Sequence, residues 1–227
     1  MGEFHAIFPA VLAATPLGLK KDERAKIADY IRNNSDQFKK NARDDVIFEE
    51  SPINLHRLTV MEPMFRQIVK AVQAALTGMG LDPNYLNLQI TRSWANYNVQ
   101  SAITSSHTHI NSHLSIVYYP DDSCNQAPLN FINTQKLHEW VPGLTNAAYA
   151  KLGVYDQKNY FSGDFLSYTP EEDLCFIFPS NIAHSVSPNE SDRPRISIAM
   201  DTLFTLKKYT RDEPLLPPPK DWAEFEL

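Results

Sequence analysis

The feature that most constrains the fold is a change of pattern after Pro83. From there the chain consists of short segments rich in Leu, Ile, Val, Tyr and Phe, separated by Asn, Asp, Pro and Ser. Such segments predict β-strands, and no long helical pattern separates them. A sandwich or jelly roll is therefore favoured over a parallel α/β sheet. The predicted strands are 86–97, 113–119, 128–132, 165–168, 174–178 and 195–204.

The chain before Pro83 has helical patterns instead. Segment 20–40 carries apolar residues at helical spacing and reaches the stop signal Asn33-Asn34-Ser35. Segment 62–79 has one apolar stripe, and Gly78 and Gly80 mark its exit. We expect both helices to pack on the outer face of the sheet and to have no chemical role.

These patterns predict one mainly β domain with flanking α-helices, because 227 residues suffice for a single large core. The domain is predicted to span 1–206, with a helical N-terminal part (1–83) and a jelly-roll core (84–206). The core carries an insert at 134–164, whose length is typical of a lid or binding loop. A Pro-rich C-terminal arm, 207–227, follows.

Charge and cysteine content exclude several partners. The net charge is −6, and no Lys- or Arg-dense run is present, so no nucleic-acid partner is expected. The chain shows neither a signal peptide nor a spanning apolar segment, which predicts a cytoplasmic protein without a membrane partner. Cys124 and Cys175 are then expected to stay reduced rather than to form a structural disulfide.

The sequence HTHINSHLSIVYY at 107–119 carries two histidines at alternate positions. On an extended segment, His107 and His109 point to the same side, because side chains alternate with period two. His184, just after an apolar strand, could close a metal site. Iron(II) accepts imidazole ligands and leaves open positions. Arg195, in the following strand, would suit the distal carboxylate of a keto-acid.

Three segments in order resemble the 2-oxoglutarate and iron(II)-dependent oxygenases of the HxH type, related to the prolyl hydroxylases. These segments are WANYNVQSAITSSHTHINSHLSIVYYP from Trp94, LNF at 129–131, and TPEEDLCFIFPSNIAHSVSPNESDRPRISIAMD from Thr169. The resemblance covers about 94–204, and FPAVLAATPL near Phe8 is similar to the family's usual start. It implies a double-stranded β-helix, which is a cupin-like jelly roll, holding one iron.

The resemblance also implies the metal ligands. His107 corresponds to the first ligand, at the end of a strand, and His184 to the distal ligand, on the turn after the FPS segment. Better-known relatives have His-x-Asp or His-x-Glu at the first pair, whereas this chain has His109 at the acidic position. Either His109 binds directly, or a water fills this position as in halogenating relatives. His113 is a spare candidate.

The cosubstrate contacts follow in the same way. Arg195 resembles the arginine that binds the C5 carboxylate of 2-oxoglutarate, and Arg193 is the runner-up because strand alternation would place it on the same face. Asn96 is expected at the C1 end, and Tyr119 at the C5 carboxylate. The chain departs from the family at Ile116 and Asp173, where glycine is usual.

The implied activity is that of a non-haem Fe(II) and 2-oxoglutarate-dependent oxygenase. It would use O2 to hydroxylate a small molecule or a protein side chain and would release succinate and CO2, with no catalytic group beyond the metal ligands. Two alternatives remain. One is a cupin-like three-histidine dioxygenase without a keto-acid, and the other is a non-catalytic jelly-roll binding protein. The sequence does not identify the prime substrate, and it leaves open whether the chain forms a homodimer.

Overall fold

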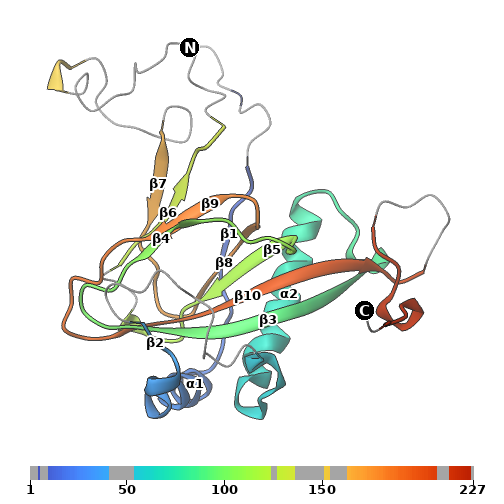
Figure 1. Cartoon of the computed structure of the whole chain (residues 1–227), viewed down its shortest axis with the longest axis horizontal. Coiled ribbons are helices and arrows are strands. Elements are labelled where there is room, and N and C mark those ends of the chain that lie inside the picture. Colours follow the sequence, from blue (N-terminus) through green and yellow to red (C-terminus); the bar gives the residue numbers. More distant parts are fainter. Residues whose placement is uncertain are drawn as a thin grey trace.

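A computed structural model describes residues 5, 10–40, 54–123, 127–135, 151–153, 163–208 and 215–225. It contains two mainly antiparallel β-sheets and two α-helices (Figure 1). The helices are α1 (Lys21–Asn33) and α2 (Glu62–Gly78). The strands are β1 (Ala13–Pro16), β2 (Lys39–Lys40), β3 (Leu86–Asn98), β4 (Thr104–His107), β5 (Leu114–Tyr118), β6 (Leu129–Ile132), β7 (Phe165–Tyr168), β8 (Leu174–Pro179), β9 (Ala183–Val186) and β10 (Arg195–Leu206).

The strands form a larger sheet in the order β1-β8-β5-β10-β3-β2 and a smaller sheet in the order β4-β9-β6-β7. All pairings are antiparallel except that between β2 and β3. Strands adjacent in the sheets come from distant parts of the chain, as β10 between β3 and β5 illustrates. The arrangement is the double-stranded β-helix predicted above.

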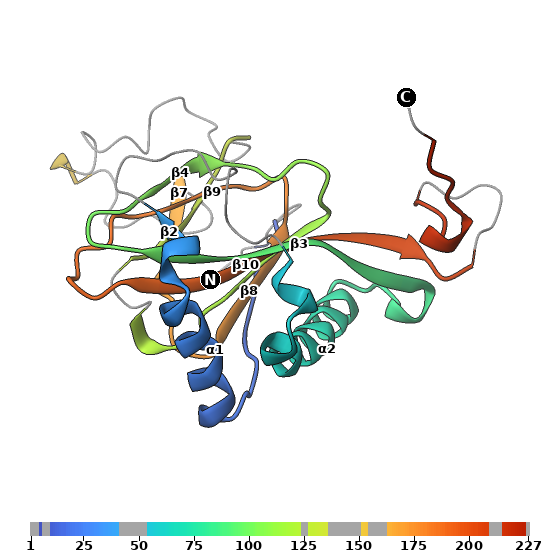
Figure 2. The same cartoon turned by 60° about the horizontal axis from the view of Figure 1, so that its bottom comes forward.

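The larger sheet separates the two helices from the smaller sheet (Figure 2). Residues on its outer face, such as Ile116, Tyr118 and Ile198, pack with the apolar stripes of α1 and α2 in one core. Its inner face forms a second core toward the smaller sheet, with Tyr119 and Phe176. The predicted packing of both helices on the outer face is therefore confirmed.

The structure adds four strands to the six predicted ranges: β1, β2, β4 and β9. Of these, only the strand that ends at His107 was implied, by the family resemblance. Strand β1 pairs with β8 along Ala13–Pro16, so the first 83 residues are not only helical but also supply an edge of the larger sheet. Each of these strands has four residues or fewer. Their sequences (AATP, KK, TSSH and AHSV) contain no run of large apolar residues, unlike the equally short β6 and β7, and pairing with neighbouring strands decides their conformation.

The C-terminal arm turns back onto the end of β10. Leu216 bridges to Thr205, and the Leu206 amide donates to the Leu216 carbonyl. Most of the predicted insert at 134–164 lies outside the described residues, as does Cys124. Within the described part of the chain, no helix has the length and apolar character needed to cross a bilayer.

Candidate metal centre

Three histidines converge between the two sheets. His107, His109 and His184 each offer a ring nitrogen, and these atoms lie within 4.8 Å of one another. The Nε2 atoms of His107 and His109 are 3.1 Å apart, and the ring centroids of His107 and His184 are 4.4 Å apart. The structure thus brings together the three residues that the sequence predicted.

The pairing of two short strands, β4 and β9, places two of these rings. His107 ends β4 and lies opposite His184 in the β4–β9 pairing. His184 lies within β9, opposite Phe131 of β6, and not on a turn as expected. His109 follows β4 in a loop, where its amide donates to the Ser180 carbonyl at 2.9 Å.

The partners of the Nδ1 atoms fix the tautomers of all three rings. Nδ1 of His107 lies 2.8 Å from the Ser105 carbonyl oxygen, and Nδ1 of His184 lies 2.9 Å from that of Ile182. Nδ1 of His109 contacts a carboxylate oxygen of Asp201. Since each partner can only accept, each Nδ1 carries the proton. In the neutral rings the Nε2 atoms are then the ones that can bind a metal ion.

His184 stays neutral over the ordinary pH range. It is buried, with its ring 4.8 Å from that of Phe178. Burial lowers the pKa of His184 to about 4, and the neighbouring His107 and His109 act in the same direction. A neutral imidazole is the form that binds metals, so no proton competes at this ligand near neutral pH.

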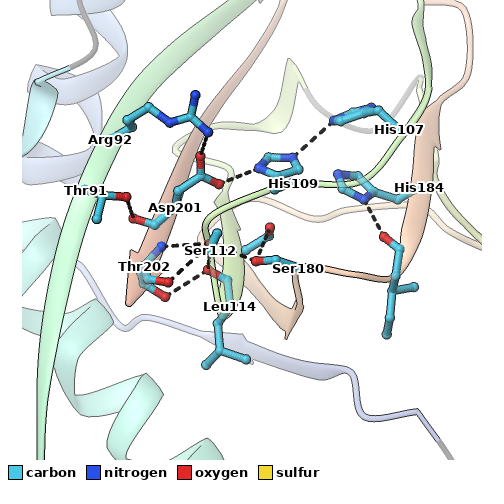
Figure 3. A network of polar contacts seen from close by, with 12 residues as sticks. Thr91, Arg92, His107, His109, Ser112, Leu114, Ser180, His184, Asp201 and Thr202 are labelled. Atoms are coloured by element: carbon cyan, nitrogen blue, oxygen red, sulfur yellow. Dashed lines mark hydrogen bonds and ion pairs between the residues drawn. The ribbon is translucent and has the colours of Figure 1, made fainter. Parts of the chain in front are cut away.

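Asp201 is the site residue that sequence reasoning missed as part of this centre. Its side chain is fully buried, and it binds His109 through one oxygen and the guanidinium of Arg92 through the other (Figure 3). The pairing of β3 with β10, which places Arg92 opposite Asp201, is not readable from spacing alone.

Serine hydroxyls hold the loop that carries His109. Ser112 Oγ accepts from the Thr202 amide at 3.1 Å and from Ser180 Oγ at 2.8 Å, linking this loop to β10 and to the turn after β8. Ser180 Oγ also lies 2.9 Å from Ser115 Oγ. Both linking serines fall in the quoted family motifs (HINS and FPS), which was the available signal for them.

Arg195 is buried in the same interior, with 1% of its surface exposed. Its Nη2 donates to the Tyr119 hydroxyl at 3.0 Å, and its Nε has no hydrogen-bond partner. Among the described residues no carboxylate pairs with it. A buried guanidinium without an anion is unfavourable, so the site is suited to an anionic group from outside the chain.

Arg193 and His113 lie elsewhere. Arg193 precedes β10, its side chain is half exposed, and it pairs with Asp122 at 2.5 Å, so strand alternation does not place it beside Arg195. This ion pair also lowers the pKa of Asp122. His113 Nδ1 accepts from the Phe204 amide at 3.0 Å and belongs to a separate contact with β10.

A row of cross-strand pairs connects the histidines to Arg195. In the β3–β10 pairing, Trp94 lies opposite Ala199, Asn96 opposite Ser197, and Asn98 opposite Arg195. Such partners share one face of a sheet. Trp94 stacks on His109 with ring centroids 5.8 Å apart. Asn96, which donates to Ser197 at 3.3 Å, therefore lies between the histidines and the arginine.

The two departures from the family pattern have separate explanations. Asp173 has φ of 67°, a left-handed conformation that favours glycine. Here the side chain offsets the strain by accepting from Tyr118 at 2.9 Å and from the Gly18 amide at 2.8 Å. Ile116 lies within β5, fully buried against the helices, so no loop is altered there.

The fold and the site together define a jelly-roll protein with a three-histidine metal-binding geometry. Comparison with family models gives a match over residues 92–201, to the family described as "Putative 2OG-Fe(II) oxygenase". This match contains all three histidines, Asp201 and Arg195. The part of the chain formed by residues 92–201 therefore belongs to this oxygenase family, as the motifs predicted.

Solved structures share the fold of this chain. A Pseudomonas putida prolyl-4-hydroxylase has a TM-score of 0.53 at 12% identity, covering 85% of this chain and 92% of that chain. EvdO2 from Micromonospora carbonacea var. aurantiaca has a TM-score of 0.53 at 15% identity, covering 95% and 93%. The α-ketoglutarate-dependent epimerase SnoN from nogalamycin biosynthesis has a TM-score of 0.52 at 13% identity, covering 87% and 81%. A comparison with curated proteins gives no match.

Proposed function

We propose that this chain is a non-haem Fe(II) and 2-oxoglutarate-dependent dioxygenase that hydroxylates a small molecule or a protein side chain. The observation that carries the proposal is the presence, in one jelly-roll interior, of three converging Nε2 atoms and a buried arginine that has no anionic partner among the described residues. The first feature suits a metal ion, and the second suits the distal carboxylate of a keto-acid.

The donor set fits iron(II). Three imidazole nitrogens are ligands that iron accepts, and a set of three leaves positions open for a chelating keto-acid and for O2. In this proposal His107, His109 and His184 hold the metal. Because the Nε2 atoms of His107 and His109 already lie 3.1 Å apart, direct binding by His109 is better supported than a water at its position. Bound iron(II) would supply the activation of O2 and the chelation of the keto-acid.

The chain's own residues would orient the cosubstrate. Arg195 and Tyr119 would bind the C5 carboxylate through the guanidinium and the hydroxyl, while Asn96 would contact the C1 end. The geometry supports this placement of the two ends of the cosubstrate. Trp94, which stacks on His109, lies opposite Ala199, and Ala199 is four residues from Arg195, roughly 13 Å along the strand. An arginine side chain and a C5 keto-diacid can fill such a gap together.

In the proposed overall reaction, 2-oxoglutarate is oxidised to succinate and CO2. One oxygen atom of O2 enters succinate and the other enters the substrate as a hydroxyl group. The burial of His184, Arg195 and Tyr119 supports a reaction space from which water is excluded. We further propose a cytoplasmic location, in line with the low cysteine content.

An anaerobic titration tests this function. The purified chain is loaded with Fe(II) and then titrated with 2-oxoglutarate, while the visible charge-transfer band of the chelated keto-acid is recorded. We expect the band in the wild type and in Arg193→Ala, and its weakening in Arg195→Ala. An unchanged band in Arg195→Ala would contradict the role of Arg195, and a chain that binds no iron would favour the non-catalytic reading.

A second function is supported by the three-histidine set itself, since cupin-like dioxygenases use three histidines without a keto-acid. Such an enzyme would bind Fe(II) but would give no band with 2-oxoglutarate. The same titration therefore separates the two enzymes. Arg195 favours the keto-acid reading, because a dioxygenase without this cosubstrate has no need for a buried guanidinium.

A further inference from the structure

We propose that Asp201, held by Arg92, is the positioning residue of the metal centre and supplies the carboxylate charge that this chain lacks among its ligands. The inference rests on the proposed function and deepens it. The relatives quoted above carry an acidic residue two positions after the first histidine, and this chain has His109 there. Asp201 lies far from His109 in the sequence, and its carboxylate contacts Nδ1 of His109 and not the Nε2 atom that faces the metal position.

The contacts of Asp201 use both of its carboxylate oxygens. Oδ1 accepts the Nδ1 proton of His109, and Oδ2 accepts from Nη2 of Arg92 (Figure 3). The Asp201 side chain is fully buried, and that of His109 is 9% exposed, whereas that of Arg92 is 32% exposed. A buried carboxylate is tolerated only when it is paired, and the pair here links the interior to a solvent-accessible guanidinium.

A β-bulge aims Asp201 at the histidine. The register between β10 and β3 shifts between Asp201 and Thr202, where Thr91 is the extra residue of β3. The Thr91 hydroxyl donates to the Asp201 carbonyl at 3.2 Å and holds the irregularity in place. Bulges redirect side chains and are frequent beside active sites. In a regular register each residue of β3 would have a partner in β10, and Thr91 would not be left over.

His109 is therefore constrained from two sides. Asp201 fixes its tautomer and ring direction, and Trp94 stacks on it at 23° between the ring planes. A metal-bound histidine that donates to a carboxylate becomes a more basic ligand. The arrangement retains the charge of a site with two histidines and one carboxylate, and moves the negative charge outward by one imidazole ring. In this proposal the ring of His109 takes the one ligand position that a water fills in the halogenating relatives, and the positions for the keto-acid and O2 stay open.

The test is metal affinity and not turnover. Co(II) is titrated into metal-free wild type, Asp201→Asn and Arg92→Gln, and binding is followed by the ligand-field absorption of the metal. We expect about 10- to 100-fold weaker binding in Asp201→Asn, the usual effect of losing a carboxylate behind a histidine ligand. Arg92→Gln should fall between this variant and the wild type. Asp201→Glu, which keeps the charge, should recover part of the affinity.

Asp173→Asn is the matched control. Asp173 is also a buried aspartate with an arginine nearby, but it bonds Tyr118 and Gly18 on the helical side of the sheet. Its substitution should lower the melting temperature and leave Co(II) binding unchanged. Wild-type affinity in Asp201→Asn would overturn the inference. A wild-type chain that does not bind Co(II) or Fe(II) would instead overturn the proposed function, so the two failures are distinguishable.

Discussion

Replacing Arg195 by methionine should separate stability from cosubstrate binding. Methionine has a comparable volume and no charge, so Arg195→Met removes a fully buried cation while the interior stays filled. Among the described residues this cation has only the neutral Tyr119 hydroxyl as a hydrogen-bond partner, and its Nε has none. Replacing buried charges by apolar residues is often neutral or stabilising by about 1–4 kcal/mol. The free energy of unfolding of the apo-protein should therefore stay unchanged or rise.

The same change should weaken 2-oxoglutarate binding strongly. Two hydrogen bonds from a guanidinium to a carboxylate contribute about 1.5–3 kcal/mol each. Arg195 is already desolvated before the keto-acid arrives, so much of this energy is realised on binding. A net loss of about 3 kcal/mol corresponds to roughly 100-fold in the dissociation constant.

Two measurements check this prediction. Urea unfolding gives the free energy of unfolding, and calorimetric titration of the metal-loaded chain gives the 2-oxoglutarate affinity. Arg193→Met is the matched control, because that arginine is half exposed and paired with Asp122. A large loss of stability together with unchanged affinity would refute the reasoning, since Arg195 would then be a structural residue.

Two further predictions concern the metal ligands and the pH dependence of stability. His107→Ala should lose stoichiometric Fe(II) after gel filtration, as measured by metal analysis, whereas His113→Ala should retain it. His113→Ala should instead lose about 1–3 kcal/mol of stability, because the Phe204 amide loses its acceptor. Loss of iron in His113→Ala alone would contradict the ligand set. Burial and the nearby Asp173 raise the pKa of Tyr118 above its ordinary value of 10.0. The folded chain thus keeps this proton while the unfolded chain releases it, so the stabilising contribution is complete below pH 10 and falls above it, by about 1.4 kcal/mol per pH unit. Urea unfolding at pH 8 and above pH 10 should show a smaller decrease for Tyr118→Phe than for the wild type, and equal decreases would contradict this assignment.

The sequence by itself determined the class of the fold and the main members of the site. Apolar stripes at helical spacing identify α1 and α2, and short segments rich in Leu, Ile, Val, Tyr and Phe identify β3, β5, β8 and β10, because elements that border a core need apolar residues in a pattern that the sequence shows directly. The motifs likewise identified His107, His109, His184 and Arg195. The structure brings the three histidines together and buries the arginine.

Tertiary structure alone decided how these residues are supported. Strands β4 (TSSH) and β9 (AHSV), which carry His107 and His184, have no run of large apolar residues that would indicate a strand. They form because each pairs with a neighbour distant in sequence. Asp201 reaches His109, and Arg92 reaches Asp201, only through the register and the bulge of β3 and β10. The sequence of a strand shows which of its residues can be buried. The cross-strand partner of a buried carboxylate depends instead on the strand register, which is set only when the sheet assembles.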